Sequence, residues 1–220
     1  MARSKGGSTR SHAAAATPVV DLDTVAAAFP DAAAETLGML QGSGALLEGH
    51  FLLSSGLHSP RYVQCAKLLE LPVRAQRVGE RLAALLRPLR VDSIVSPALG
   101  GLIIGHEVGR ALGVRAIFAE RVEKELMLRR GFSLSSADRV VVIEDVVTTG
   151  LSTRETIAVA TAAGARVAGA GAIIDRSGGA SNLGVPFHAL ETLSLPTYQP
   201  DSCPLCAKGV AVTKPGSRAS

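Results

Sequence analysis

The sequence predicts an α/β domain built on a doubly wound, mainly parallel sheet flanked by helices. Aliphatic segments of strand length alternate with helical patterns along most of the 220 residues, which is typical of a parallel sheet. Three of these strands run into turns rich in glycine or small polar residues, as strands do where an open α/β sheet binds ligands. Apolar residues make up 47% of the chain and aromatic residues only 3%, so the core is expected to be aliphatic.

The first part of the chain is expected to supply two helices and a hairpin. Residues 31–41 have a helical pattern with Asp31 as a plausible cap, and residues 49–65 alternate apolar and polar side chains around a Ser-Ser-Gly turn, as two paired strands do. A longer helix, residues 73–86, follows Pro72 and ends before Pro88. Its buried face is expected to hold four apolar side chains, Val78, Leu82, Leu85 and Leu86.

The second part repeats a unit of strand, glycine-bearing turn and helix. The expected segments are a strand and turn at 91–101, a helix at 102–113 closed by Gly113, a strand at 114–121, a strand at 140–147, a helix at 152–164 closed by Gly164, and a strand and turn at 165–179. Residues 122–139 are more charged than the strands on either side, so they are expected to form an exposed arm or lid.

Charge and composition exclude several classes of protein. Residues 1–20 carry Arg3, Lys5 and Arg10 and no acid, so the rest of the chain has a net charge near +1, which argues against a nucleic-acid partner. No apolar run reaches the ~18 residues of a membrane span. Three cysteines are too few for a disulfide scaffold, so a cytoplasmic location is expected. Residues 1–20 are expected to be a disordered tail, although they faintly resemble a transit peptide.

The segment "VVVIEDVVTTGLS", residues 140–152, carries the most specific chemistry. A buried strand ends at the adjacent acids Glu144 and Asp145, and a run of small hydroxyl residues and glycine then leads into a helix. Backbone amides at a helix start, with hydroxyls beside them, suit a phosphate monoester. Adjacent carboxylates suit vicinal hydroxyls or a hydrated Mg²⁺. Phosphate beside a diol describes a ribose 5-phosphate; the competing interpretation is a solvated strand end followed by a capped turn.

Two common nucleotide motifs are excluded. No G-x-x-x-x-G-K-[ST] sequence occurs, and no G-x-G-x-x-G sequence follows a strand, because Gly100, Gly101 and Gly105 have the wrong spacing. The phosphate site is therefore expected to belong to neither the triphosphate nor the dinucleotide class.

The same thirteen residues resemble the phosphoribosyl diphosphate (PRPP) signature of type I phosphoribosyltransferases. The segments "HFLLSSGLHSPRYVQC", "LRRGF", "IIDRSGG", "CPLC" and "PGSR" add a resemblance to the bacterial orotate phosphoribosyltransferase family, over about residues 30–218. The resemblance implies one phosphoribosyltransferase domain over residues 21–220. Its core would span about 73–180, and a small hood would comprise about 30–70 and 185–220.

The resemblance also implies a reaction: transfer of the phosphoribosyl group of PRPP to orotate, with Mg²⁺ as cofactor, in pyrimidine biosynthesis. A homodimer with shared active sites is implied, and no membrane partner. Arg176 would grip the orotate carboxylate, Thr148 would also touch orotate, and Ala98 to Gly101 would approach the diphosphate. Arg121 and Lys124 would act in catalysis from the arm of the neighbouring subunit, together with Asp145. PRPP would be bound by Glu144, Asp145, Val146, Val147, Thr148, Thr149, Gly150, Leu151 and Ser152.

The chain departs from the family pattern where cations contact the diphosphate. Ser54 and Gly100 stand where many orotate enzymes have lysines, and the arm lacks the common Lys-x-x-Lys-x-His pattern. Positive charge would come from fewer groups, or from Arg129 and Arg130.

One pair of cysteines has the spacing of half a zinc site. Cys203 and Cys206 form a single C-x-x-C with no second pair nearby, and Cys65 and His50 are only conceivable partners, so a reduced turn is favoured over zinc. No metal ligand is assigned, and His58 and His106 receive no role.

Two rival functions remain open. A phosphoribosyltransferase for another base would share the PRPP loop, and a regulatory protein could keep the PRPP fold and bind nucleic acid. The low charge of the body speaks against the second.

Overall fold

The structure, a computed structural model, describes residues 32–53 and 55–215. The expected tail, residues 1–20, and the expected cap, Asp31, lie outside these residues. The strands are β1 (Leu46–Leu52), β2 (His58–Val63), β3 (Ser93–Pro97), β4 (Arg115–Val122), β5 (Glu125–Leu128), β6 (Arg139–Val147), β7 (Arg166–Asp175) and β8 (Phe187–Thr192). The helices are α2 (Ala32–Gly42), α3 (Cys65–Leu69), α4 (Pro72–Leu86), α5 (Gly101–Leu112), α6 (Leu151–Ala162) and α7 (Pro204–Ala207), with short 3₁₀ turns η1 (Arg87–Leu89) and η2 (Pro200–Ser202).

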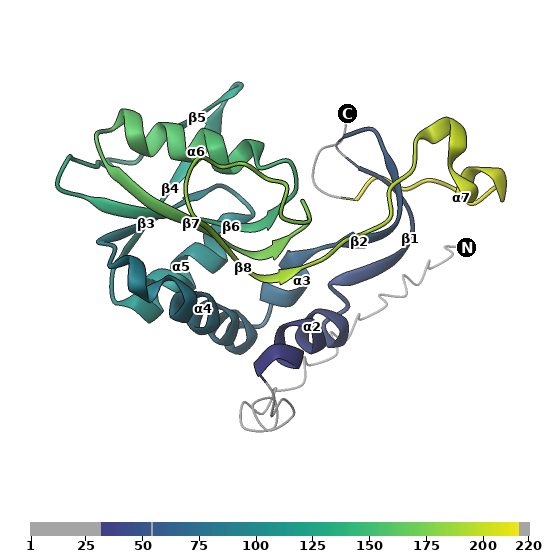
Figure 1. Ribbon diagram of the computed structural model, residues 1–220, viewed down its shortest axis with the longest axis horizontal. Helices are drawn as coiled ribbons and strands as arrows, with labels where there is room; N and C mark the ends of the chain where they lie inside the picture. The colour runs from purple at the N-terminus through teal and green to yellow at the C-terminus, as the bar shows by residue number, and fades with distance from the viewer. Residues whose placement is uncertain (1–31, 54, 216–220) are drawn as a thin grey trace, which may run out of the picture.

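Six strands form the main sheet in the order β5-β4-β3-β6-β7-β8, and β1 and β2 form a separate hairpin. All neighbours in the main sheet are parallel except β4 and β5. Helices α4 and α5 lie on one face of this sheet and α6 on the other (Figure 1). The predicted fold class, a mainly parallel sheet flanked by helices, is confirmed.

Strand β6 is apolar on both faces because it is covered on both faces. Val141 and Ile143 belong to the larger core cluster, which also holds α4 and α5 side chains. Val140 and Val142 belong to two clusters that include side chains of α6. All four valine and isoleucine side chains are fully buried.

The buried face of α4 differs from the prediction at one residue. Val78, Leu82 and Leu86 are buried as expected, but Leu85 is 43% exposed. A Cβ on Gly79 would lie 2.5 Å from Glu107 Cβ of α5, so the small residue permits close helix packing. The buried face is therefore rotated toward Gly79 and Ala83, which leaves Leu85 at its edge.

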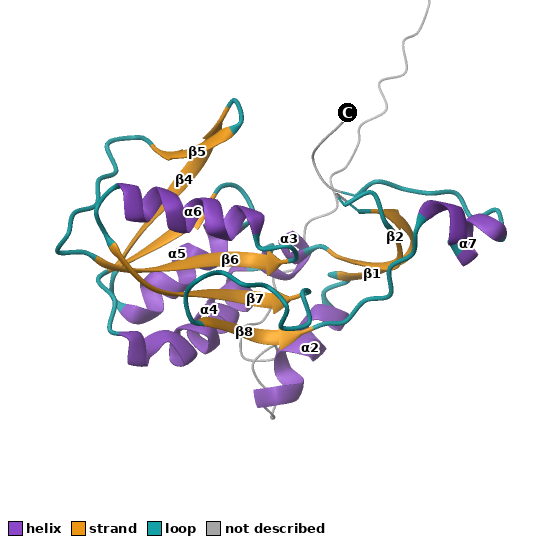
Figure 2. Cartoon of the chain, turned by 45° about the horizontal axis from the view of Figure 1, so that its top comes forward, coloured by secondary structure: helices purple, strands orange, loops and turns teal. Residues whose placement is uncertain are grey.

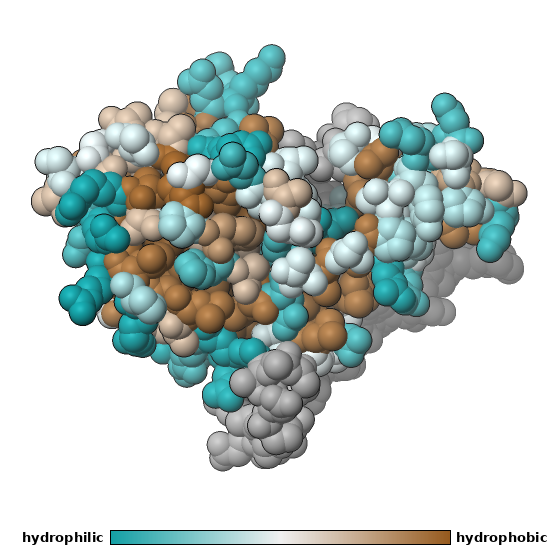
Figure 3. Space-filling model, in the orientation of Figure 1, coloured by the Kyte–Doolittle hydropathy of each residue, from teal (hydrophilic) through white to brown (hydrophobic). Residues whose placement is uncertain are grey.

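The predicted arm, residues 122–139, is only partly an arm. Its first part pairs with β4 as β5, and this hairpin projects from the sheet (Figure 2) with a hydrophilic tip (Figure 3). Phe132 and Leu134 in the second part pack against a core cluster, and Phe132 contacts Phe118 edge-to-face at 5.1 Å. Only the β4–β5 hairpin is therefore exposed as predicted, because these apolar side chains return the chain to the core.

The C-terminal part of the chain belongs to two regions. β8 pairs in parallel with β7, so residues 187–192 extend the main sheet, although they were assigned to the hood. Farther on, Tyr198 and Thr213 make isolated bridges to His58 and Phe51 of the predicted hairpin. The segment after β8 therefore leaves the sheet and lies along β1 and β2 (Figure 1). No helix in the described residues is long and apolar enough to cross a bilayer.

Candidate active site

The order of the strands creates a crevice between β3 and β6. The chain passes from β3 outward to β4, then crosses to β6 and continues to β7 on the other side, so strand order reverses between β3 and β6. Pairing between them extends only to Val95 and Val142, whereas β6 continues along β7 to Val147. Ligands of open α/β sheets bind at such a switch point, beyond the carboxyl ends of the strands.

The loop after β6 is shaped around Gly150. This residue has φ +74°, and a Cβ there would lie 2.7 Å from Leu183 Cδ2, so only glycine fits without strain. Helix α6 begins at the next residue, and its first backbone N–H groups have no acceptor within the helix. Arg154 Nη1 donates to the carbonyl oxygen of Thr149 at 2.9 Å, which holds the loop to the helix.

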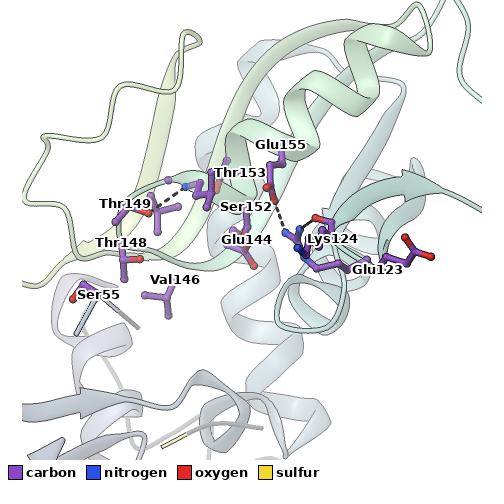
Figure 4. Close-up of a pocket in the computed structure, with 14 residues that line it drawn as sticks. Ser55, Glu123, Lys124, Glu144, Val146, Thr148, Thr149, Ser152, Thr153 and Glu155 are labelled. Carbon is purple, nitrogen blue, oxygen red and sulfur yellow. Dashed lines mark hydrogen bonds and ion pairs between the residues drawn. The ribbon is translucent and has the colours of Figure 1, made fainter. Parts of the chain in front are cut away.

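A cavity of about 730 Å³ lies over this loop. Figure 4 shows Glu144 between Thr148 and Thr149 on one side and Lys124 on the other. The hydroxyl groups and the start of α6 offer hydrogen-bond donors suited to an anion on this side of the cavity. The cavity is lined by Ser55, Arg121, Glu123, Lys124, Glu144, Val146, Val147, Thr148, Thr149, Gly150, Leu151, Ser152, Thr153 and Glu155.

Glu144 and Asp145 form an acidic pair without a matching cation. Glu144 is buried and Asp145 is half-buried, and no ion pair to either is found among the described residues. Burial, and then the charge of Asp145, raise the pKa of Glu144 to about 9. Burial also raises the pKa of Asp145, opposed by the hydrogen bond that the Val146 N–H donates to its carboxylate at 2.8 Å. The pair therefore favours a ligand that supplies positive charge or hydroxyl donors.

The turn after β3 lies against Asp145. A Cβ on Gly100 would lie 2.8 Å from Asp145 Oδ1, and a Cβ on Gly101 would lie 2.8 Å from the carbonyl oxygen of Ile143. The Ala98–Leu99 peptide bond is cis. Neither Asp145 nor this turn is among the residues that line the cavity, but the two glycines bring the turn to the edge of the acidic pair.

Arg176 lies in the loop after β7, and its backbone N–H donates to the carbonyl oxygen of Val147, the last residue of β6, at 2.8 Å. Its Nε is buried and has no hydrogen-bond partner within the described part of the chain, and burial lowers the pKa of the guanidinium. The buried carboxylate of Asp175 shapes this loop, because it accepts hydrogen bonds from the Ser177 amide at 2.7 Å and the Gly179 amide at 2.9 Å. A buried guanidinium whose Nε has no partner among the described residues is suited to a carboxylate ligand.

Tyr62, on β2, is a neighbour of this group that the sequence did not single out. Burial, and then the charge of Asp145, raise the pKa of Tyr62, while the charge of Arg176 lowers it. Both charged groups therefore lie near its phenol. Tyr62 also packs against Phe51 with ring centroids 5.9 Å apart, so the β1–β2 hairpin supplies an aromatic wall next to Arg176.

The β4–β5 hairpin separates its cations between two sides. Arg121 and Lys124 line the cavity, and Arg121 forms an ion pair with Glu155 of α6 and donates to the Lys124 carbonyl oxygen. Arg129 and Arg130 instead pair with Glu120. Glu120 is adjacent to Arg121 on β4, so the two side chains point to opposite sides of the strand. Arg121 and Lys124 lie at the cavity of their own chain.

Most of the residues selected from the sequence thus meet at one crevice. The cavity is lined by Arg121, Lys124, Glu144 and residues 146–152, whereas Asp145, Arg176 and residues 98–101 are not among its lining residues. Five residues near the crevice had been given no role: Ser55, Tyr62, Glu123, Thr153 and Glu155. Tyr62 and Ser55 were detectable only as parts of the family-like segment at 50–65, because their partners are far away in the sequence.

Comparisons with known proteins agree with this geometry. The chain is 52% identical over 180 residues to the orotate phosphoribosyltransferase of Thermotoga maritima, covering 82% of this chain and 96% of that protein. It is 53% identical over 188 residues to the orotate phosphoribosyltransferase of Novosphingobium aromaticivorans, covering 84% and 97%. No family model matches the chain.

Solved structures resemble the fold as well. A crystal structure of orotate phosphoribosyltransferase from Aeropyrum pernix aligns with a TM-score of 0.60 and 26% identity, covering 71% of this chain and 92% of that chain. The UMP synthase of Leishmania donovani aligns with a TM-score of 0.64 and 28% identity, covering 74% of this chain and 37% of that chain. At half identity over nearly the full length of its curated relatives, the chain belongs to the orotate phosphoribosyltransferase family.

Proposed function

We propose that this chain transfers the phosphoribosyl group of PRPP to orotate, giving orotidine 5′-phosphate and diphosphate in pyrimidine biosynthesis. The observation that carries the proposal is the acidic pair Glu144–Asp145, which has no ion-pair partner among the described residues and lies next to the start of α6, in a chain half identical to orotate phosphoribosyltransferases. The acidic pair matches the ribose hydroxyls, and the helix start matches the 5-phosphate of a phosphorylated ribose.

The PRPP subsite is proposed to run along the loop after β6. Backbone amides at the start of α6 and the hydroxyls of Thr148, Thr149 and Ser152 bind the 5-phosphate, and Val146, Val147 and Leu151 complete the loop wall. Glu144 and Asp145 accept hydrogen bonds from the two ribose hydroxyls. Those bonds favour the ionised carboxylates, which offsets the repulsion between them.

Orotate is proposed to lie between Arg176, Thr148 and Tyr62. The buried, unpartnered Nε of Arg176 supports this assignment, since a carboxylate that accepts two parallel N–H groups would satisfy it. Tyr62 supplies an aromatic surface near the same position.

Arg121 and Lys124 are proposed to stabilise the leaving diphosphate. As the bond from the anomeric carbon to the diphosphate breaks, positive charge develops on the sugar and negative charge on the leaving group. Arg121 is paired with Glu155, so contact with the diphosphate requires exchange of that partner. Movement of the hairpin over the substrate would also exclude water from the reactive sugar.

Mg²⁺ is the proposed cofactor. The described acids and hydroxyls at the crevice are oxygen donors, and Glu144 and Asp145 lack a cation partner among the described residues, which fits a hard divalent ion that keeps waters and shares substrate phosphates. Glu144 and Asp145 would hold the hydrated ion together with the substrate. When bound, Mg²⁺ would neutralise charge on the diphosphate.

We also propose that the enzyme is a cytoplasmic homodimer. All three cysteines are unpaired, which suits a reducing compartment. Leu99 and Ile103 expose 76% and 48% of their surface beside the crevice, which suits contact with a second subunit.

The direct test is a spectrophotometric assay of orotate consumption with PRPP and Mg²⁺, run beside uracil, adenine and hypoxanthine at equal concentrations. Orotate alone should be consumed at a high initial rate, and EDTA should abolish the rate until excess Mg²⁺ restores it. Turnover of another base without orotate would replace the proposed substrate. Salt-dependent RNA or DNA binding without any turnover would favour a regulatory protein instead.

A further inference from the structure

Four side chains of the types that bind metal ions meet at the β1–β2 hairpin, although the two histidines lie about 150 residues before the two cysteines. His50 lies in β1 and His58 begins β2, whereas Cys203 and Cys206 flank the start of the short helix α7. One ligand atom from each lies within 4.8 Å of all the others. None of the four lines the PRPP cavity, and Figure 1 shows α7 next to the hairpin, outside the six-stranded sheet.

The distances within this cluster match those around a tetrahedral zinc ion. With Zn–S near 2.3 Å and Zn–N near 2.05 Å, neighbouring sulfur and nitrogen ligands lie about 3.6 Å apart. Cys203 Sγ lies 3.5 Å from His50 Nε2, and Cys206 Sγ lies 3.8 Å from His50 Nε2 and 3.3 Å from His58 Nδ1. The two imidazole nitrogens are 2.9 Å apart, so a small outward shift makes the set regular.

The hydrogen bonds of His50 direct one nitrogen toward the cluster. Its Nδ1 lies 2.7 Å from the carbonyl oxygen of Val210, so Nδ1 carries the proton and donates. The Nε2 lone pair is then left to face His58 and the two sulfurs. Metal-bound histidines make this same second hydrogen bond to a backbone carbonyl, which fixes the tautomer and the ring orientation.

Three of the four side chains are buried, unlike those in a chance arrangement of surface residues. His50, His58 and Cys203 are 2%, 8% and 3% exposed, and Cys206 closes the group at the surface. Two imidazoles and two thiols are poor hydrogen-bond partners for one another, so packing them together without an ion leaves polar atoms weakly satisfied.

Backbone hydrogen bonds already join the β1–β2 hairpin to the C-terminal segment that carries the two cysteines. Thr213 accepts from the Leu52 amide at 2.8 Å and donates its own amide to His50 O at 2.8 Å, and Tyr198 exchanges two 2.9 Å hydrogen bonds with His58. An ion here would cross-link the hairpin to a segment about 150 residues later in the chain. Closing so long a loop is where a cross-link stabilises most.

We propose that His50 Nε2, His58 Nδ1, Cys203 Sγ and Cys206 Sγ bind one structural Zn²⁺. Two thiolates and two imidazoles in a tetrahedral set favour zinc over Mg²⁺ or Ca²⁺, and four protein ligands leave no open position for chemistry. The ion clamps the hairpin whose turn places Ser55 on the wall of the PRPP cavity. The site thus couples the C-terminal segment to the geometry of the active site.

Zinc content tests the proposal without reference to activity. The full chain, purified without a metal-binding tag in reducing buffer, should contain about one zinc per chain by mass spectrometry of the metal. Cys206→Ser and His58→Ala should each lose most of it. Cys65→Ala and His106→Ala are the matched controls, since they remove the same residue types outside the cluster, and they should retain the metal.

A second measurement uses only the unmodified chain. Replacement of zinc by Co²⁺ should give the strong visible absorption of tetrahedral cobalt with thiolate ligands. A strong chelator should lower the thermal midpoint, and Zn²⁺ but not Mg²⁺ should restore it. The proposal is overturned if the zinc-reconstituted chain holds under a tenth of an equivalent, if both cluster variants keep the wild-type content, or if Cys203 and Cys206 are found as a disulfide. Because the readout is metal content, a failure of the proposed reaction leaves this result unaffected.

Discussion

The acidic pair Glu144–Asp145 is the residue-scale feature with the clearest energetic cost. In the unfolded chain Glu144 titrates near its ordinary value of 4.5, whereas burial and Asp145 raise its pKa to about 9 in the folded chain. Between these two pH values the folded state binds more protons than the unfolded state. The free energy of unfolding therefore falls as the pH rises through this window.

We predict that Glu144→Gln stabilises the free protein and impairs the enzyme. The variant should melt near the wild-type temperature at pH 5 and above it at pH 8, by about 2–4 °C for each kcal/mol of relieved cost. Its kcat/KM should fall because an acceptor for ribose is lost. Thermal unfolding at both pH values is the measurement, with Glu48→Gln, a 73% exposed side chain, as control. An equal shift at both pH values would contradict the assignment.

Arg176 is predicted to determine orotate binding. Arg176→Ala should lower kcat/KM for orotate more than tenfold, mainly through KM, and Arg176→Lys should not restore it because lysine lacks the paired donors. Arg166→Ala, at the opposite end of β7, is the matched control and should stay near wild type. Initial rates at varied orotate decide the matter. Near-wild-type activity of Arg176→Ala would remove this residue from the site.

At the scale of elements, the start of α6 acts through its backbone. Gly150 and Gly113 have nearly equal φ angles, +74° and +72°. A Cβ on Gly150 would meet close neighbours, whereas a Cβ on Gly113 would meet none, and only Gly150 lies in the loop between β6 and α6. Alanine at either position should destabilise the fold by about 1 kcal/mol or more. Only Gly150→Ala should also raise the KM for PRPP strongly. Similar PRPP kinetics for both variants would argue against the phosphate cradle.

The β4–β5 hairpin allows a second matched comparison. Arg121→Ala should lower kcat by roughly 10²-fold, as loss of a transition-state donor does. Arg129→Ala should change kcat little, because Arg129 pairs with Glu120 on the other side of β4. Saturating steady-state kinetics measure both. If Arg129→Ala lowered kcat more than Arg121→Ala, Arg129 and Arg130 would be assigned to stabilise the leaving diphosphate instead.

At the scale of the whole molecule, the proposed homodimer can be measured directly. Light scattering should give twice the 22.6 kDa mass of one chain. If the hairpin serves the neighbouring subunit, each mixed dimer of Arg121→Ala and Asp145→Asn has one intact site of two, so a random equimolar mixture should regain activity at about a quarter of all sites. Dimers without any regain would assign each hairpin to the cavity of its own chain, where Arg121 lies in the structure.

Local pattern was sufficient to predict the main strands and the loop between β6 and α6. The aliphatic run of β6, the glycines that close α5 and α6, and the thirteen residues 140–152 contain their information in adjacent positions. The same locality explains the errors. Leu85 fits the helical stripe, and its exposure depends on how closely α4 packs against α5 at Gly79. The return of Phe132 to the core likewise depends on Phe118 on a different strand.

The sequence by itself thus determined the α/β class and predicted the phosphate loop and the acidic pair, and the family resemblance predicted the role of Arg176. Only the tertiary structure decided that Arg121 and Lys124 face the cavity while Arg129 and Arg130 do not, since this depends on which side of β4 each partner lies. Only the tertiary structure joined His50 and His58 to Cys203 and Cys206. The physical reason is that a cluster of side chains depends on distances in space, and folding brings His50 and His58 next to two cysteines about 150 residues later, which no sequence spacing connects.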